Sequence, residues 1–159
     1  MKEEPLSGFQ KAQDHDAALA VYTSGTTGSP KGVLHEYGNL KLHMATRNNG
    51  GKDRTRMKER FAFIAPLNFV AFYKNLVTAI VAGIQLFIVP YATVKNPVLL
   101  RRYFEEKGIT TSFLSPSLIR ALKGNIPSCV KMIFTGSEPA NGIFLEQVRL
   151  VNVYGMSES

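Results

Sequence analysis

The sequence is poor in cysteine and tryptophan and lacks a long apolar run. Its 159 residues include one cysteine, Cys129, and no tryptophan. A single cysteine cannot form an internal disulfide, which fits a reducing compartment, and its serine and valine neighbours favour a structural role over a nucleophilic one. The longest apolar run, Leu76–Val89, is interrupted by Thr78, Gly83 and Gln85, so it falls short of the roughly 18 residues of a membrane-spanning helix. The first residues are polar and lack the apolar core of a signal peptide. We therefore expect a cytoplasmic protein without a membrane partner.

Acidic residues are also scarce, with 12 against 19 basic residues and a net charge of +7. Much of the excess lies in Arg47–Arg60, which holds six basic and two acidic residues around an Asn-Asn-Gly-Gly centre. The run contains no aromatic residue that could stack on a base, so a solvated surface loop is favoured. An RNA-binding domain acting through this run is the minor alternative.

Apolar residues make up 45% of the chain and charged residues 19%, which is typical of a globular protein. The pattern predicts strands at Ala17–Tyr22, Phe61–Ala65, Gln85–Val89, Thr110–Leu114, Lys131–Phe134 and Arg149–Val153. It predicts helices from Asn39 to about Arg47, around Phe69–Ile80 up to Gly83, from Pro97 to Lys107, and a short one from Ser117. Helices that alternate with strands predict an α/β fold with a largely parallel sheet.

Four polar clusters directly follow predicted strands. They are Thr23–Gly32, Ser115-Pro116, Gly136–Pro139 and Tyr154–Ser159. In open α/β sheets, ligands bind outside the carboxyl ends of the strands. We therefore expect these clusters to converge on one crevice.

The first cluster, in the stretch "VYTSGTTGSPKGVLH", is a small loop with many hydrogen-bond donors that ends in a lysine. Such a loop can wrap backbone N–H groups around phosphate oxygens, while the lysine neutralises charge. The G-x-x-x-x-G-K-[ST] pattern does not fit, because Pro30 stands at the second glycine and Gly32 follows Lys31. From its residues alone, the stretch is either a phosphate loop of another kind or a surface turn.

Three motifs resemble signatures of the adenylate-forming superfamily, which includes acyl-CoA synthetases, luciferases and the adenylation domains of nonribosomal peptide synthetases. "YTSGTTGSPKGV" resembles its phosphate loop, "FTGSEP" its adenine-side loop, and "NVYGMSES" its N-x-Y-G-x-[TS]-E signature, in the family's order. The resemblance implies that this α/β chain is part of the large N-terminal domain of an adenylate-forming enzyme. Residues 1–16 would then be a polar lead-in, and residues 17–159 a central part of the adenylation domain.

The resemblance also implies a role for each matching residue. The residues that would hold the β- and γ-phosphates of ATP are Thr23, Ser24, Gly25, Thr26, Thr27, Gly28 and Lys31. Those that would form the adenine and α-phosphate site are Gly136, Ser137, Glu138, Tyr154, Gly155 and Ser157. Tyr154 would stack on the adenine ring, and Glu158 would bind Mg²⁺, which prefers oxygen ligands. Lys31 and Glu158 are thus the expected catalytic residues. Taken singly, Tyr154 would be a core aromatic and Glu158 a solvated carboxylate.

The implied enzyme is an ATP-dependent ligase. It would activate a carboxylic or amino acid as an acyl-adenylate and then form a thioester on a carrier-protein phosphopantetheine. Coenzyme A as the thiol acceptor is one alternative, and a nucleotide-binding fragment without activity is another.

The chain departs from the family pattern at its ends. The family continues beyond the last signature with a ribose-binding aspartate, a hinge and a C-terminal domain whose lysine contacts the reacting carboxylate. This chain ends one residue after Glu158 and begins shortly before the phosphate loop. We interpret it as a central fragment and expect no turnover from it alone.

Val70 bears on the substrate. Counting back from Gly83 places Val70 where many amino-acid-activating members carry an aspartate that pairs with the substrate's α-amino group. A valine cannot pair with an ammonium, and burying that charge unpaired is costly. The residue therefore favours a carboxylic acid without a conventionally held amine.

Overall fold

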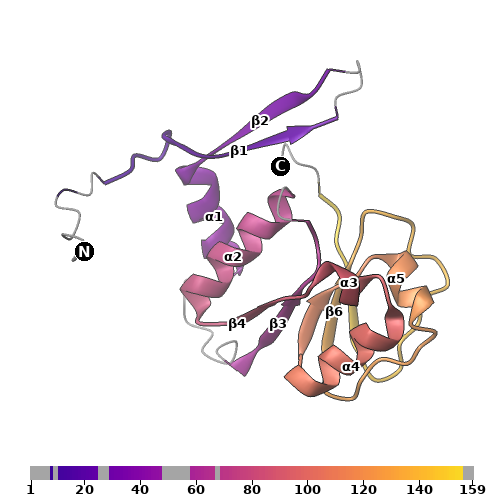
Figure 1. The fold of residues 1–159 in the computed structure, drawn as a ribbon. Coiled ribbons are helices and arrows are strands. Elements are labelled where there is room, and N and C mark those ends of the chain that lie inside the picture. Colours follow the sequence, from indigo (N-terminus) through magenta and orange to yellow (C-terminus); the bar gives the residue numbers. More distant parts are fainter. Residues whose placement is uncertain (1–7, 9–10, 25–28, 48–57, 67–68, 156–159) are drawn as a thin grey trace, which may run out of the picture.

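The structure is a computed structural model, and it describes residues 8, 11–24, 29–47, 58–66 and 69–155. Its strands are β1 (Ala17–Thr23), β2 (Lys31–Glu36), β3 (Arg60–Phe63), β4 (Gln85–Ile88), β5 (Thr111–Phe113), β6 (Met132–Thr135) and β7 (Arg149–Asn152). Its helices are α1 (Tyr37–Arg47), α2 (Val70–Ala82), α3 (Tyr91–Val94), α4 (Pro97–Lys107) and α5 (Pro116–Ala121) (Figure 1).

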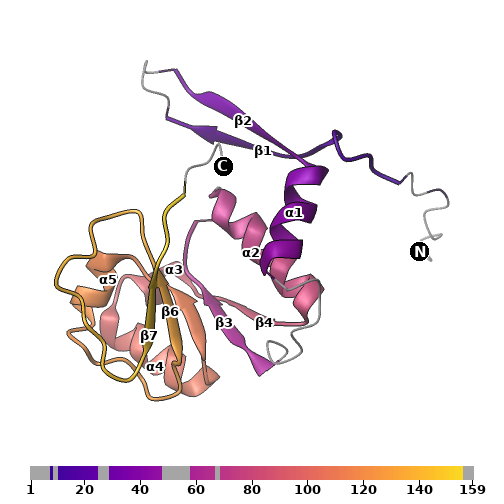
Figure 2. The same cartoon turned by 180° about the vertical axis from the view of Figure 1, so that it is seen from behind.

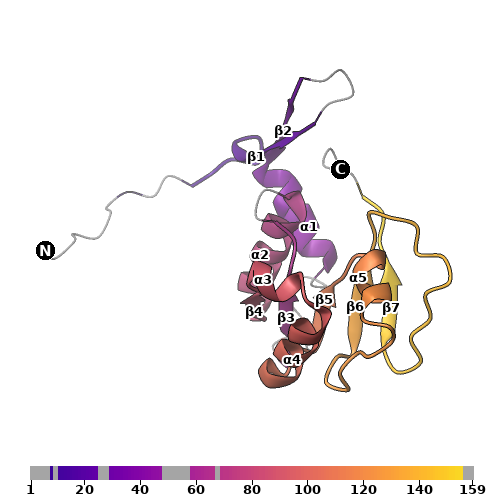
Figure 3. The same cartoon turned by 45° about the vertical axis from the view of Figure 1, so that its right-hand side comes forward.

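The described strands form two separate sheets. Five of them make a parallel sheet in the order β4-β3-β5-β6-β7, whereas β1 and β2 pair as an antiparallel hairpin. Figure 3 shows the hairpin standing apart from the parallel sheet, above α1 and α2. The predicted α/β fold with a largely parallel sheet is confirmed.

Helices cover both faces of the parallel sheet. Phe61 and Phe63 of β3 pack in a cluster with Ala79 of α2, while Ala62 between them packs with Leu100 of α4 on the opposite face. This alternation follows from the two-residue period of a strand. In Figures 1 and 2, α1 and α2 lie on one side of the molecule, and α3, α4 and α5 on the other. A sheet buried on both faces explains why its strands are nearly continuous apolar runs.

The predicted ends of α2 and α4 are confirmed. Asn96 caps α4, since its side-chain oxygen accepts hydrogen bonds from the N–H groups of Val98 at 3.0 Å and Leu99 at 3.2 Å. Gly108 ends α4 and Gly83 ends α2, both with a positive φ that a glycine adopts at little cost.

Other predicted boundaries were wrong. Helix α1 begins at Tyr37 rather than Asn39, and the Asn39 side chain instead accepts a hydrogen bond from the N–H of Glu36 at 3.0 Å. Helix α5 begins at Pro116 rather than Ser117, because Ser115 caps it. Strand β2 was not predicted, since its residues were assigned to the loop that precedes them or were left unassigned. Helix α3 was not predicted either.

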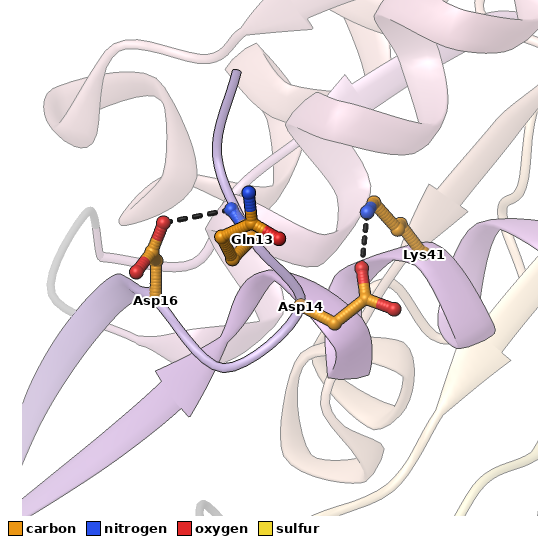
Figure 4. A network of polar contacts seen from close by, with 4 residues as sticks. All are labelled: Gln13, Asp14, Asp16 and Lys41. Carbon is orange, nitrogen blue, oxygen red and sulfur yellow. Dashed lines mark hydrogen bonds and ion pairs between the residues drawn. The ribbon is translucent and has the colours of Figure 1, made fainter. Parts of the chain in front are cut away.

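The lead-in segment before β1 is attached to the start of α1. Asp14 forms an ion pair with Lys41 (Figure 4). The carbonyl oxygen of Asp14 also accepts a hydrogen bond from the N–H of Gly38 at 2.7 Å. A Cβ on Gly38 would lie 3.1 Å from that oxygen, so a glycine permits this approach. The N–H of Gln13 donates to the Asp16 carboxylate at 2.7 Å, which closes the turn before β1. Asp14–Asp16 of the predicted lead-in are thus part of the fold.

Two other residues have structural roles. Cys129 is half-buried and its thiol donates to the carbonyl oxygen of Phe104 at 3.5 Å, in agreement with the expected structural role. Arg60 donates to the carbonyl oxygen of Lys107 at 2.7 Å and to the Gln85 side chain at 2.6 Å, and lies over the Phe87 ring. Arg60 therefore does not belong to a free basic surface, while residues 48–57 of the basic run lie outside the described part. Among the described helices, none has the length and apolar character needed to cross a membrane.

Candidate functional site

Three of the four polar clusters lie at one edge of the parallel sheet. Ser115-Pro116 follows β5, Gly136–Pro139 follows β6, and Val153–Gly155 follow β7. Strands β5, β6 and β7 are adjacent and parallel, so their carboxyl ends meet at one edge (Figure 2). This is the edge at which ligands bind in open α/β sheets.

The remaining cluster, Thr23–Gly32, begins at the end of β1, which belongs to the hairpin rather than to the parallel sheet, and its convergence with the other three stays a prediction. Thr23 is the last residue of β1, and Lys31, the first residue of β2, pairs with it directly. Ser24 and Lys31 are exposed, and Thr23 is half-buried. The hairpin thus brings Thr23, Ser24 and Lys31 to one end, while Gly25–Gly28 lie outside the described residues. Figure 1 shows the chain after β7 running towards this hairpin.

Gly136 allows β6 and β7 to approach closely at their carboxyl ends. A Cβ on Gly136 would lie 2.3 Å from the carbonyl oxygen of Val153, a distance that no side chain tolerates. The N–H of Val153 donates to the carbonyl oxygen of Thr135 at 2.8 Å, immediately before this glycine. Ser137 follows with a φ of 68°, in the left-handed region, and its hydroxyl donates to the carbonyl oxygen of Gly136. The backbone therefore turns sharply beside the end of β7.

The turn after β6 is tied to α5. The Ser117 hydroxyl donates to the Glu138 carboxylate, and the Arg120 guanidinium donates to the carbonyl oxygens of Pro139 at 3.1 Å and Asn141 at 3.2 Å. Sequence reasoning missed Ser117 and Arg120. Ser117 was recognised only as part of a short helix, because no local pattern indicated that it would bond to Glu138, 21 residues later.

Tyr154 projects from the same edge. It follows β7 and is 94% exposed, so its alternative interpretation as a core aromatic was wrong. An exposed ring beside a glycine turn presents a flat surface on which an aromatic ligand can stack. Gly155 is also exposed, whereas Ser157 and Glu158 lie outside the described residues.

A small pocket opens behind this edge, between α2 and the sheet, and sequence reasoning did not predict it. Its volume is about 110 Å³. The lining residues are His43, Phe61, Ala71, Lys74, Asn75, Phe113, Phe134 and Val153. Its walls are mostly apolar, and its polar groups come from His43 of α1 and from Lys74 and Asn75 of α2. Val153 joins this pocket to the turn at Gly136.

A larger groove of about 640 Å³ lies on the other face of the sheet, between α3, α4 and α5. It is lined largely by apolar residues, including Ile64, Val89 and Leu118, with Ser115 and Ser117 at one side. Within the described ranges, no three His, Cys, Asp or Glu residues lie close enough together to hold a metal ion.

The chain is similar to known proteins over nearly its whole length. Residues 2–159 match the model of the family described as AMP-binding enzyme. Gramicidin S synthase 1 from Brevibacillus brevis is 30% identical over 151 residues, which cover 91% of this chain and 13% of that protein.

Two solved structures share the fold. The inhibitor-bound N-terminal domain of FACL13 from Mycobacterium tuberculosis matches 98% of this chain and 40% of its own, with a TM-score of 0.76 and 20% identity. The o-succinylbenzoate coenzyme A synthetase from Bacillus subtilis, in complex with ATP and magnesium ion, matches 87% of this chain and 29% of its own, with a TM-score of 0.67 and 21% identity.

These matches have two consequences. This chain spans only a small part of its relatives, 13% of gramicidin S synthase 1 and 29% of the coenzyme A synthetase. The family match nevertheless covers both strand ends that carry Gly136 and Tyr154, and the hairpin that carries Lys31. The chain belongs to the AMP-binding enzyme family.

Proposed function

We propose that the protein containing this chain activates a carboxylic acid with ATP, forming an acyl-adenylate and pyrophosphate. The observation that carries the proposal is the close approach of Gly136 to Val153 at the carboxyl ends of β6 and β7, directly before the exposed Tyr154. Gly136 is buried against the carbonyl group of Val153, whereas Tyr154, the next residue, has an exposed ring. A purine can stack on such a ring while its edge faces backbone groups of the turn.

The hairpin supplies the phosphate end of the proposed site. Lys31 and the Thr23-Ser24 pair lie at the same end of the hairpin, and Gly25–Gly28 follow Ser24 in the sequence. Backbone N–H groups, hydroxyls and one ammonium are the donors that phosphate oxygens accept. Glu158 would hold Mg²⁺, which neutralises phosphate charge when bound, and Ser157 would lie near the α-phosphate.

The reaction needs positioning and charge neutralisation rather than a covalent bond to the protein. A carboxylate oxygen of the substrate attacks the α-phosphorus. The bond between that phosphorus and its bridging oxygen breaks, and pyrophosphate leaves with the electron pair. A thiol then attacks the acyl carbon, AMP leaves, and the thiol proton passes to solvent. We propose a carrier-protein phosphopantetheine as the thiol, with coenzyme A as the alternative acceptor.

The pocket of about 110 Å³ is the proposed site of the acid's side chain. It has room for about four water-sized groups, at about 30 Å³ each, so it fits a small substrate. Val70 and Lys74 are four residues apart on α2 and therefore lie on one helix face. The Val70 side chain itself offers an α-ammonium neither an opposite charge nor a hydrogen-bond acceptor. The chemistry of this face favours an acid without an α-amino group.

Pyrophosphate exchange into ATP tests the proposal directly. The protein containing this chain is assayed with a panel of small α-amino acids and the matching deamino acids. We expect exchange with deamino acids, because an amino acid loses a hydrogen bond to a charged group worth about 1.5–3 kcal/mol. Val70→Asp should shift the preference towards amino acids, whereas Val81→Asp, at an exposed position of the same helix, should not.

Each other outcome has a definite meaning. ATP binding without exchange on any acid would indicate the nucleotide-binding alternative. Tenfold preference for the amine form would show that another residue pairs with it, and the substrate inference would be wrong. Failure to bind ATP would overturn the whole proposal.

A further inference from the structure

The loop after β6, residues Gly136–Asn141, is held by side chains of α5. Ser117 donates to the Glu138 carboxylate, and Arg120 donates to the carbonyl oxygens of Pro139 and Asn141. These bonds connect two segments that follow neighbouring strands, β5 and β6. They fix the loop at both its middle and its far end.

The loop has few other means of support. Ser137, Glu138 and Pro139 are exposed, and Ser137 holds a left-handed φ of 68° that is unfavourable for a residue with a Cβ. Two backbone hydrogen bonds flank the exposed turn, from the N–H of Val153 to the carbonyl oxygen of Thr135 and from the N–H of Ile143 to that of Ala140. A loop with a strained residue and little burial keeps one conformation only when other contacts impose it.

We propose that Ser117 and Arg120 are positioning residues for the purine base of ATP. They hold the loop so that the backbone of Gly136 and Ser137 stays beside Tyr154. Glu138 acts through its bond to Ser117, as the anchor of the loop, rather than through its own contact with the base. This inference rests on the proposed use of ATP.

The chemistry of the three bonds fits this role. A hydroxyl that donates to a carboxylate makes a charge-assisted hydrogen bond, which is stronger than a neutral one. The Nη2 nitrogen of Arg120 donates to two carbonyl oxygens, so this one side chain holds the loop at both Pro139 and Asn141. Both residues are exposed and lie outside the main core cluster, so their loss should disturb the loop before it disturbs the fold.

The experiment measures binding of ATP and of inorganic tripolyphosphate by calorimetry, using the protein that contains this chain. Ser117→Ala, Glu138→Ala and Arg120→Ala should each weaken ATP binding about three- to tenfold, since each removes one or two hydrogen bonds. Tripolyphosphate lacks the purine, so its affinity should not change. A general structural defect would weaken both ligands and lower the melting temperature.

Control variants and a double-mutant cycle test the proposal further. Ser128→Ala and Arg102→Ala alter exposed residues away from the loop and should leave ATP binding unchanged. Glu138→Gln keeps an oxygen that accepts from Ser117 and should bind ATP within about twofold of wild type, because a neutral acceptor loses only the charge-assisted part of the bond. Combining Ser117→Ala with Glu138→Ala should cost no more than either change alone, because both remove the same bond.

The outcomes separate this inference from the proposed function. A wild-type protein that does not bind ATP would overturn the proposed function. Normal ATP binding by wild type together with control-like affinity in the α5 variants would overturn this inference alone. Additive losses in the double variant would show that Glu138 contacts the base directly, which also contradicts it.

Discussion

The hairpin and the parallel sheet are stabilised in different ways. In β3, all of Phe61, Ala62 and Phe63 are buried, between helices on both faces. In the hairpin, one residue of each strand is buried, Val21 and His35, while Tyr22 and Leu34 are exposed. Burial of apolar area is the main favourable term in folding, so the sheet contributes far more of the stability.

The described parts of the two regions do not differ in the number of buried polar atoms that lack a hydrogen-bond partner. Among the described residues, each carries one buried polar atom without a hydrogen-bond partner, Nε2 of His35 in the hairpin and Oγ1 of Thr135 in the sheet. What differs is how much apolar surface each region buries. The proposed base site lies on the well-packed sheet edge, and the proposed phosphate site lies on the less buried hairpin.

The largest expected effect is that of Gly136→Ala, at the end of β6, and Gly32→Ala in the hairpin is its comparison. Gly136→Ala would place a Cβ 2.3 Å from the carbonyl oxygen of Val153, so β6 and β7 must separate. We expect a loss of about 1–3 kcal/mol in the free energy of unfolding, as for other overpacked sites, together with loss of ATP binding. Denaturant unfolding and calorimetry measure the two effects.

Gly32→Ala is the matched change in the hairpin. Its Cβ would meet the Tyr22 ring at 3.4 Å, an ordinary contact distance. The free energy of unfolding should change by less than about 0.5 kcal/mol, as for surface substitutions. Equal losses for the two glycines would contradict the distinction between the regions.

The second prediction is that Lys31 is required for activity but not for stability. Lys31 is exposed at the start of β2, so Lys31→Ala should leave the melting temperature unchanged. If its ammonium neutralises phosphate charge, pyrophosphate exchange should fall about 100-fold, comparable to losing one preorganised donor. Lys11→Ala, at another exposed lysine, serves as the control. Unchanged exchange in Lys31→Ala would remove this residue from the site.

The parallel sheet was predictable from the sequence because its signals are local. Asn96-Pro97 begins α4 and Gly108 ends it, and these residues act within one turn of their own position. The hairpin was less predictable. Strand β2 follows a glycine- and proline-rich loop, and half-exposed residues such as Val33 give it little apolar periodicity.

The candidate site was predictable only as separate motifs. The turn at Gly136 and the residues around Tyr154 follow adjacent parallel strands, whereas their roles in binding a nucleotide stay a prediction from the resemblance. The bond between Ser117 and Glu138, and the pocket behind Val153, depend on packing between elements far apart in the chain. No single-sequence pattern encodes such contacts.

The smallest expected effect lies where the hairpin's lead-in meets α1, at the ion pair between Asp14 and Lys41 (Figure 4). The hydrogen bond from Lys41, followed by its charge, lowers the pKa of Asp14 below the ordinary 3.8. A carboxylate with a lowered folded-state pKa contributes stability above its unfolded pKa, and that stability is lost as the pH falls through the folded value. The contribution should therefore be complete near neutral pH and vanish in acid, well below 3.8.

Both side chains of this pair are largely exposed, 73% for Asp14 and 52% for Lys41, so solvent and salt screen the interaction. We expect Asp14→Asn to lower the melting temperature slightly at neutral pH, and the difference from wild type to disappear in acid and in high salt. The backbone bond from Gly38 to the Asp14 carbonyl does not depend on the carboxylate, so it should keep the lead-in attached in the variant. Nuclear magnetic resonance titration of Asp14, in wild type and in Lys41→Met, measures the pKa directly. An equal pKa in the two proteins would show that Lys41 does not hold this carboxylate, and that the lead-in is attached by backbone bonds alone.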